Sequence, residues 1–121
     1  MKQPCLIFHP RHDDRSSLGD WWPDAGKYPQ GLAPLVEHVR SRGLQFGLWV
    51  EPEMVNPDSD LYRAHPDWVL GVEGVPQVMA RHQLVLDLAR PEVSAYLFER
   101  LDDLLSRHDI GYLKWDMNRD L

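Results

Sequence analysis

The strongest fold signal in the sequence is the stretch Ile110-Gly111-Tyr112-Leu113-Lys114-Trp115-Asp116-Met117-Asn118-Arg119. Its apolar, β-prone beginning predicts a buried strand. Three polar residues, Lys114, Asp116 and Asn118, then stand at alternate positions, so they share one face of that strand. Polar groups at the end of a buried strand are costly unless they serve each other or a ligand. Two interpretations follow, a structural Lys114–Asp116 pair and a ligand site.

The composition is typical of one globular domain. The chain has 121 residues, of which 43% are hydrophobic and 26% charged. Its net charge of -6 gives no electrostatic basis for binding nucleic acid or an anionic membrane. No segment approaches the ~20 apolar residues of a membrane span. The single Cys5 excludes an internal disulfide, and residues 5–8 are too short for a signal-peptide core, so we expect a cytoplasmic protein.

The hydrophobic pattern predicts helices that alternate with strands. A stripe of apolar residues predicts a helix from Leu32 to a stop at Gly43, and a second stripe predicts a helix that begins at Pro91 and includes Leu105 in the core. Residues 1–12 are expected to be irregular, 13–31 to form a loop, and 58–64 to contain a short helix. Parallel strands are expected near residues 44–50, 83–88 and 110–116. This order indicates an α/β fold whose parallel sheet is covered on both faces.

All three predicted strands end in carboxylates. Glu51 and Glu53 follow the first strand, Asp87 follows the second, and Asp116 follows the third. In a (β/α)8 barrel the C-terminal strand ends converge on one mouth, where the active site lies. Such a convergence would gather acids from separate parts of the sequence into one pocket.

Two further residues suit that pocket. Trp49 alternates with Glu51 and would face the same mouth, and Arg81 precedes the second strand and would supply a fixed cation. Retaining glycoside hydrolysis uses two carboxylates, one of which is the nucleophile. A neighbouring lysine favours the ionised form of a carboxylate, and aromatic rings offer apolar platforms for sugars. The set fits a retaining glycosidase, although composition alone does not force that choice.

Six motifs occur in order along the chain. They are Ser16-Ser17-Leu18-Gly19-Asp20-Trp21, Lys27-Tyr28-Pro29-Gln30-Gly31-Leu32, Gly43-Leu44-Gln45-Phe46-Gly47-Leu48-Trp49-Val50-Glu51-Pro52-Glu53-Met54-Val55, His65-Pro66-Asp67-Trp68, Arg81-His82-Gln83-Leu84-Val85-Leu86-Asp87 and Lys114-Trp115-Asp116-Met117-Asn118-Arg119. Together they resemble the catalytic barrel of the microbial α-galactosidases, or melibiases, of glycoside hydrolase family 36, over residues 11–121. The resemblance implies part of a (β/α)8 TIM barrel, roughly strands one or two to four. The implied activity is retaining hydrolysis of terminal α-D-galactosyl residues from oligosaccharides such as melibiose and raffinose.

The resemblance also implies roles for single residues. Asp116 matches the catalytic nucleophile at the end of the fourth barrel strand. Lys114 and Asn118 match residues that hydrogen-bond the galactose hydroxyls, and Arg81 and Trp49 match further residues of the galactose pocket. Family members are metal-independent and often oligomeric, and the resemblance implies no cofactor.

The chain departs from the family pattern at both ends. The family's Asp-Asp-Gly-Trp-Phe-Gly segment should occupy positions 4–9, where only Phe8 agrees, so the paired sugar-binding acids are absent. The chain stops at Leu121, before the sixth strand that carries the acid/base, and a whole barrel needs about 250 residues. We therefore expect a divergent segment over 1–12 and a partial TIM-barrel catalytic domain over 13–121. Such a fragment should be inactive alone, and its open sheet edges favour self-association or pairing with a missing barrel half.

Three alternatives remain open. A metal-dependent lyase or racemase would use Glu51, Asp87 and Asp116 as Mg²⁺ ligands, but it gives Trp49 no role. A Schiff-base aldolase would use Lys114, although Asp116 beside it would hold the amine protonated. The third alternative is a non-catalytic remnant or split half of an α-galactosidase.

Overall fold

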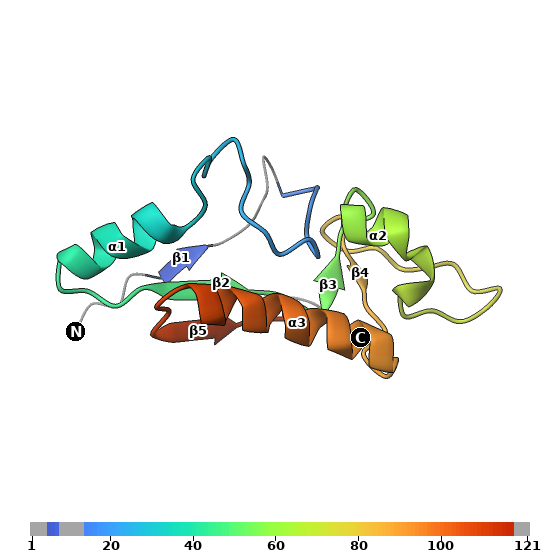
Figure 1. Ribbon diagram of the computed structural model, residues 1–121. Coiled ribbons are helices and arrows are strands. Elements are labelled where there is room, and N and C mark those ends of the chain that lie inside the picture. Colours follow the sequence, from blue (N-terminus) through green and yellow to red (C-terminus); the bar gives the residue numbers. More distant parts are fainter. Residues whose placement is uncertain (1–4, 8–13, 118–121) are drawn as a thin grey trace.

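A parallel sheet of three strands organises the chain (Figure 1). The computed structural model describes the backbone of residues 5–7 and all of residues 14–117. Strands β1 (Cys5–Ile7), β2 (Gly47–Val50) and β5 (Tyr112–Trp115) lie in the order β1-β2-β5. Both pairings are parallel, so β2 is central. The expected α/β class with parallel strands is confirmed.

Two expectations about strands are wrong. Residues 1–12 were expected to be irregular, but Cys5–Ile7 forms β1, a strand too short to stand out in the sequence. Residues 83–88 were expected to form a parallel strand, but β4 (Leu84–Val85) pairs antiparallel with β3 (Met54–Val55) in a separate two-stranded sheet. The apolar run is buried as its composition predicts, with Leu84 5% and Leu86 2% exposed. An apolar pattern does not specify which strand the run pairs with.

The two long helices lie close to where the sequence predicts them. Helix α1 (Ala33–Ser41) carries proline in its first turn, and α3 (Pro91–Arg107) begins at a proline, where a missing N–H leaves no bond unmade. Helix α2 (Asp60–Ala64) and the 3₁₀ helix η1 (Pro66–Trp68) lie between β3 and β4, near the predicted short helix. No helix within the described ranges is long and apolar enough to cross a membrane.

The core lies on one side of β2. Leu48 and Val50, two residues apart, are both 0% exposed, whereas Trp49 between them is only partly buried. Leu48 packs in a cluster with α1, and Val50 packs in a larger cluster with β3, β4 and α3. The alternation expected of a strand therefore leaves Trp49 on the opposite face from the core.

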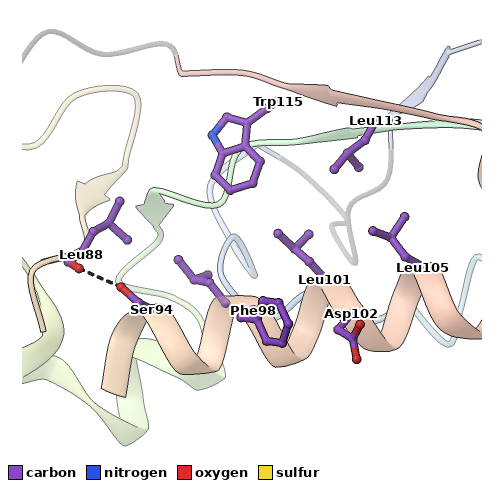
Figure 2. A pocket seen from close by; sticks show the side chains of 9 residues that line it. Leu88, Ser94, Phe98, Leu101, Asp102, Leu105, Leu113 and Trp115 are labelled. Carbon is purple, nitrogen blue, oxygen red and sulfur yellow. Dashed lines mark hydrogen bonds between the residues drawn. The ribbon is translucent and has the colours of Figure 1, made fainter. Parts of the chain in front are cut away.

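Helix α3 and β5 leave an apolar groove open to solvent (Figure 2). Its volume is about 420 Å³, and it is lined by Leu88, Ser94, Leu97, Phe98, Leu101, Asp102, Leu105, Leu113 and Trp115. Phe98 is 70% exposed and Trp115 is 52% exposed. The expectation that Leu105 is simply core is wrong, because it is 43% exposed and lines this groove.

Asp20, from the first sequence motif, serves the fold. Its carboxylate is buried and accepts hydrogen bonds from the backbone N–H of Leu61 at 2.9 Å and of Asp60 at 3.2 Å. Burial raises the pKa of the Asp20 carboxyl, and these two hydrogen bonds oppose that rise. The side chain thus ties the loop before α1 to the start of α2.

Candidate active site

The C-terminal ends of β2 and β5 bring an indole and a carboxylate together. Trp49 is the register partner of Lys114 in the parallel pair, which places the two strand ends side by side. The indole N–H of Trp49 donates to Oδ2 of Asp116 at 2.9 Å, and this bond is partly buried. Two residues that the sequence singled out, 67 positions apart, therefore lie in direct contact.

Hydrogen bonds fix both oxygens of the Asp116 carboxylate. Its Oδ1 accepts from the backbone N–H of Met117 at 3.0 Å, while Oδ2 accepts from the indole. The backbone N–H of Asp116 donates to the carbonyl of Val50 at 2.9 Å, which continues the β2–β5 ladder one residue past the strand. A partly buried carboxylate oriented in this way is suited to attack a bound electrophile.

Lys114 lies on the same face of β5 as Asp116, because Leu113 and Trp115 line the groove on the other face (Figure 2). Lys114 is exposed. In the part of the chain that the structure describes, no ion pair joins Lys114 to Asp116. The structural-pair interpretation is therefore not realised, and the ammonium group is presented to solvent on the side of the candidate site.

The strand-end acids that were expected to converge have different surroundings. Glu51 follows β2 and is 1% exposed, and Glu53 Oε1 accepts a hydrogen bond from the indole N–H of Trp115 at 3.3 Å. Asp87 follows β4, which does not belong to the parallel sheet. Its Oδ1 accepts from the backbone N–H of Ala89 at 3.2 Å in the turn that leads into α3. The expectation that Asp87 ends a strand of the parallel sheet is thus wrong, because β4 pairs with β3.

Arg81 lies at the tip of a tight turn. Ala80 and Gln83 exchange backbone hydrogen bonds of 3.3 and 2.9 Å, and between them Arg81 and His82 have φ values of 54° and 59°. Two successive positive φ values are typical of type I′ turns, which favour glycine and asparagine. Backbone strain of this kind concentrates at functional sites. The Arg81 side chain is exposed, and no hydrogen bond or ion pair joins it to Trp49 or Asp116 among the described residues.

Two further predictions concern Asn118 and a metal site. Asn118 lies outside them, so its role stays a prediction. Within residues 14–117, no three His, Cys, Asp or Glu side chains lie close enough to hold one metal ion. This geometry does not support Glu51, Asp87 and Asp116 as joint ligands of Mg²⁺.

Sequence reasoning missed Asn56. Its side chain is 0% exposed and hydrogen-bonds to Leu18 and to the carbonyl of His82, next to Arg81. An asparagine before a proline reads as an ordinary turn residue, and nothing in the sequence marks it as a link between distant segments.

Comparison with known proteins extends these observations. The family model described as Melibiase matches residues 7–121. The alpha-galactosidase of Escherichia coli is 54% identical over 114 residues, which is 94% of this chain and 16% of that protein. Alpha-galactosidase AgaA of Geobacillus stearothermophilus is 53% identical over 114 residues, with the same coverage of each chain. The chain thus spans about 16% of the length of these curated relatives.

Solved structures match the whole chain closely. Alpha-galactosidase AgaB of Geobacillus stearothermophilus, of glycoside hydrolase family 36, superposes with a TM-score of 0.93 at 48% identity, over 100% of this chain and 17% of that chain. A variant of AgaA from the same organism, in complex with raffinose, gives a TM-score of 0.93 at 49% identity with the same coverage. A second AgaA variant, in complex with stachyose, gives a TM-score of 0.92 at 48% identity, again over 100% of this chain and 17% of that chain.

Proposed function

This chain belongs to the Melibiase family, and we propose that it supplies the nucleophile of a retaining α-galactosidase. The proposed reaction releases terminal α-D-galactosyl residues from oligosaccharides of the melibiose and raffinose type. The observation that carries the proposal is the hydrogen bond from Trp49 Nε1 to Asp116 Oδ2 at the paired ends of β2 and β5. The similarity to α-galactosidases, one of them in complex with raffinose, supports the choice of substrate.

In the proposed mechanism Asp116 attacks the anomeric carbon of the galactosyl unit. A bond forms from a carboxylate oxygen to that carbon as the bond to the leaving oxygen breaks, and a second carboxylic acid protonates the leaving oxygen. In retaining enzymes the two carboxyl groups lie about 5–5.5 Å apart. Water then hydrolyses the covalent intermediate, with the second carboxyl group acting as base.

Four further side chains take part in sugar binding in this proposal. Lys114 and Asn118 donate hydrogen bonds to galactose hydroxyls, and Arg81 and Trp49 complete the pocket. The exposed ammonium of Lys114 beside the Trp49–Asp116 bond supports this arrangement.

We also propose that residues 13–121 are part of a (β/α)8 barrel. The parallel order β1-β2-β5, with α1 and α3 in the connections, supports this, and the three strands would be the second to fourth of the barrel. The divergent leading segment of residues 1–12 supplies β1 to this sheet, so in this proposal the barrel begins within that segment. We place the protein in the cytoplasm, on the basis of its single cysteine.

The groove between α3 and β5 is the proposed site of self-association of the 121-residue chain. Four of the apolar residues that line it are exposed, namely Leu88, Phe98, Leu105 and Trp115, and β5 ends the described sheet beside it. Exposed apolar patches and unpaired strand edges both promote association.

A hybrid enzyme tests the activity. In this hybrid, the chain replaces the matching 114-residue segment of the Escherichia coli relative. We expect the purified hybrid to hydrolyse an aryl α-galactoside, to leave the β-galactoside intact and to be insensitive to a chelator. The isolated chain, assayed beside it, is expected to show no turnover. A folded hybrid without α-galactosidase activity would contradict the proposal, and loss of activity with a chelator would favour the metal-dependent alternative.

A further inference from the structure

Asn56 joins two segments that are far apart in the sequence. Its Oδ1 accepts a hydrogen bond from the backbone N–H of Leu18 at 2.8 Å, and its Nδ2 donates to the carbonyl of His82 at 2.8 Å. The backbone N–H of Asn56 also donates to the carbonyl of Leu18 at 3.0 Å. The side chain is 0% exposed, so both ends of its amide are used away from solvent.

The segment that Asn56 holds on one side is the strained turn at Arg81 and His82. Their φ values are 54° and 59°, a region that residues other than glycine and asparagine rarely occupy. Such a conformation persists only where the surroundings enforce it. The Nδ2–His82 bond supplies that restraint from outside the turn, in addition to the Ala80–Gln83 backbone pair.

Asn56 is itself held in place. It directly follows β3, whose two residues are paired with β4, and its carbonyl accepts from the hydroxyl of Ser59 at 2.7 Å. Only residues 51–53 separate β3 from β2, the strand that carries Trp49. Asn56 thus lies close in the sequence to β2 and hydrogen-bonds directly to the Arg81 turn.

We propose that Asn56 is a positioning residue for Arg81. Its amide holds the carbonyl of His82, keeps both turn residues at positive φ and thereby sets the direction in which the Arg81 guanidinium meets the substrate. The role of Asn56 in substrate binding rests on the proposed function, whereas its restraint on the turn does not. Aspartate has nearly the same shape but cannot donate, so Asn56→Asp would place a carboxylate oxygen against the carbonyl of His82.

The first experiment measures the turn in the full 121-residue chain, without reference to activity. The one-bond coupling between Cα and Hα reports the sign of φ at Arg81 and His82 by NMR. We expect Asn56→Asp to lose the positive φ values. The matched control is Ser59→Ala, which removes the bond to the Asn56 carbonyl and the cap on Tyr62 N but leaves the Nδ2–His82 bond. We expect Ser59→Ala to retain positive φ even though it also lowers Tm.

The second experiment measures kinetics in the hybrid enzyme. Loss of one neutral hydrogen bond predicts a rise in KM of about tenfold for Asn56→Asp, with kcat changed much less. Ser59→Ala should change neither constant, although it destabilises the same segment. Positive φ values retained in Asn56→Asp would overturn the restraint. A lost turn with unchanged KM would overturn its role in binding.

Two provisions keep these outcomes decisive. If Asn56→Asp does not fold, Asn56→Ser replaces it, because the shorter side chain cannot reach the His82 carbonyl. An inactive but folded hybrid without any substitution would count against the proposed function alone, and the NMR result would still decide the restraint on the turn.

Discussion

Trp49 Nε1 lies 2.9 Å from Asp116 Oδ2, and this distance depends on the parallel register that pairs Trp49 with Lys114. The two side chains come from neighbouring strands of one sheet, so backbone pairing places them with little freedom. The site is therefore built on the most regular part of the fold, as functional groups that need fixed geometry should be.

Replacing the indole while keeping an aromatic ring isolates this hydrogen bond. Trp49→Phe in the hybrid enzyme should lower kcat about 10- to 100-fold, because a hydrogen bond to a charged group contributes about 1.5–3 kcal/mol. Tm should change little, since Trp49 faces away from the core. Steady-state kinetics with an aryl α-galactoside measure the effect, and a kcat within about twofold of the unsubstituted hybrid would show that the bond has no catalytic role.

Lys114 should act on binding more than on folding. Lys114→Met keeps the length of the side chain and removes its donors, so we expect KM to rise about 10-fold or more through lost hydrogen bonds to sugar hydroxyls. Because Lys114 is exposed and forms no ion pair with Asp116, the unfolding transition should stay where it is. Isothermal titration of the hybrid enzyme with galactose measures the effect on binding, and a thermal melt measures the effect on folding. A lower Tm with unchanged affinity would assign Lys114 to structure instead.

Tyr96 should make stability fall at high pH. Its hydroxyl donates to the carbonyl of Gly19 at 2.8 Å, and burial raises its pKa to about 12 from the ordinary value of 10.0. The folded chain thus keeps the Tyr96 hydroxyl proton in a pH range where the unfolded chain loses it. The stabilisation from Tyr96 is complete below pH 10 and is lost as pH rises toward 12.

Urea unfolding of the 121-residue chain from about pH 9, below both pKa values, to about pH 12 tests this expectation. Tyr96→Phe should be less stable at the low end of the range and should lose less stability across it. Parallel curves for the two proteins would contradict the assignment.

The groove beside α3 should control association of the isolated chain. Phe98 is 70% exposed and lines the groove, so Phe98→Lys should shift sedimentation velocity profiles toward monomer. Val72 is 71% exposed and does not line the groove, so Val72→Lys is the matched control. An equal effect of both substitutions would show that general surface hydrophobicity, and not the groove, drives association.

The sequence was sufficient for the features that depend on local periodicity. Apolar spacing predicted α1 and α3, and the alternation of Lys114 with Asp116 predicted that they share a face of β5. It was insufficient where pairing is non-local. The run at Leu84–Val85 is as apolar as a central strand, but its partner is β3, and only the three-dimensional arrangement shows this.

The site itself was only partly predictable for the same reason. A carboxylate after each predicted strand indicated convergence. The acids after β2 and β5 do follow neighbouring parallel strands, whereas Asp87 follows a strand outside the parallel sheet. The strained turn at Arg81 contains no glycine or asparagine that would have marked it. Asn56 acts through two contacts, 38 and 26 positions away, that no local pattern encodes.

The most direct test asks whether a galactosyl unit becomes attached to Asp116. The hybrid enzyme is incubated with a fluorinated α-galactosyl fluoride, whose covalent intermediate hydrolyses slowly, and is then analysed by intact mass and peptide mapping. We expect one fluorogalactosyl adduct, located on Asp116 and absent from Asp116→Asn. An active hybrid whose adduct lies on another carboxylate, or that forms no adduct while it turns over substrate, would contradict the assignment of Asp116 as the nucleophile.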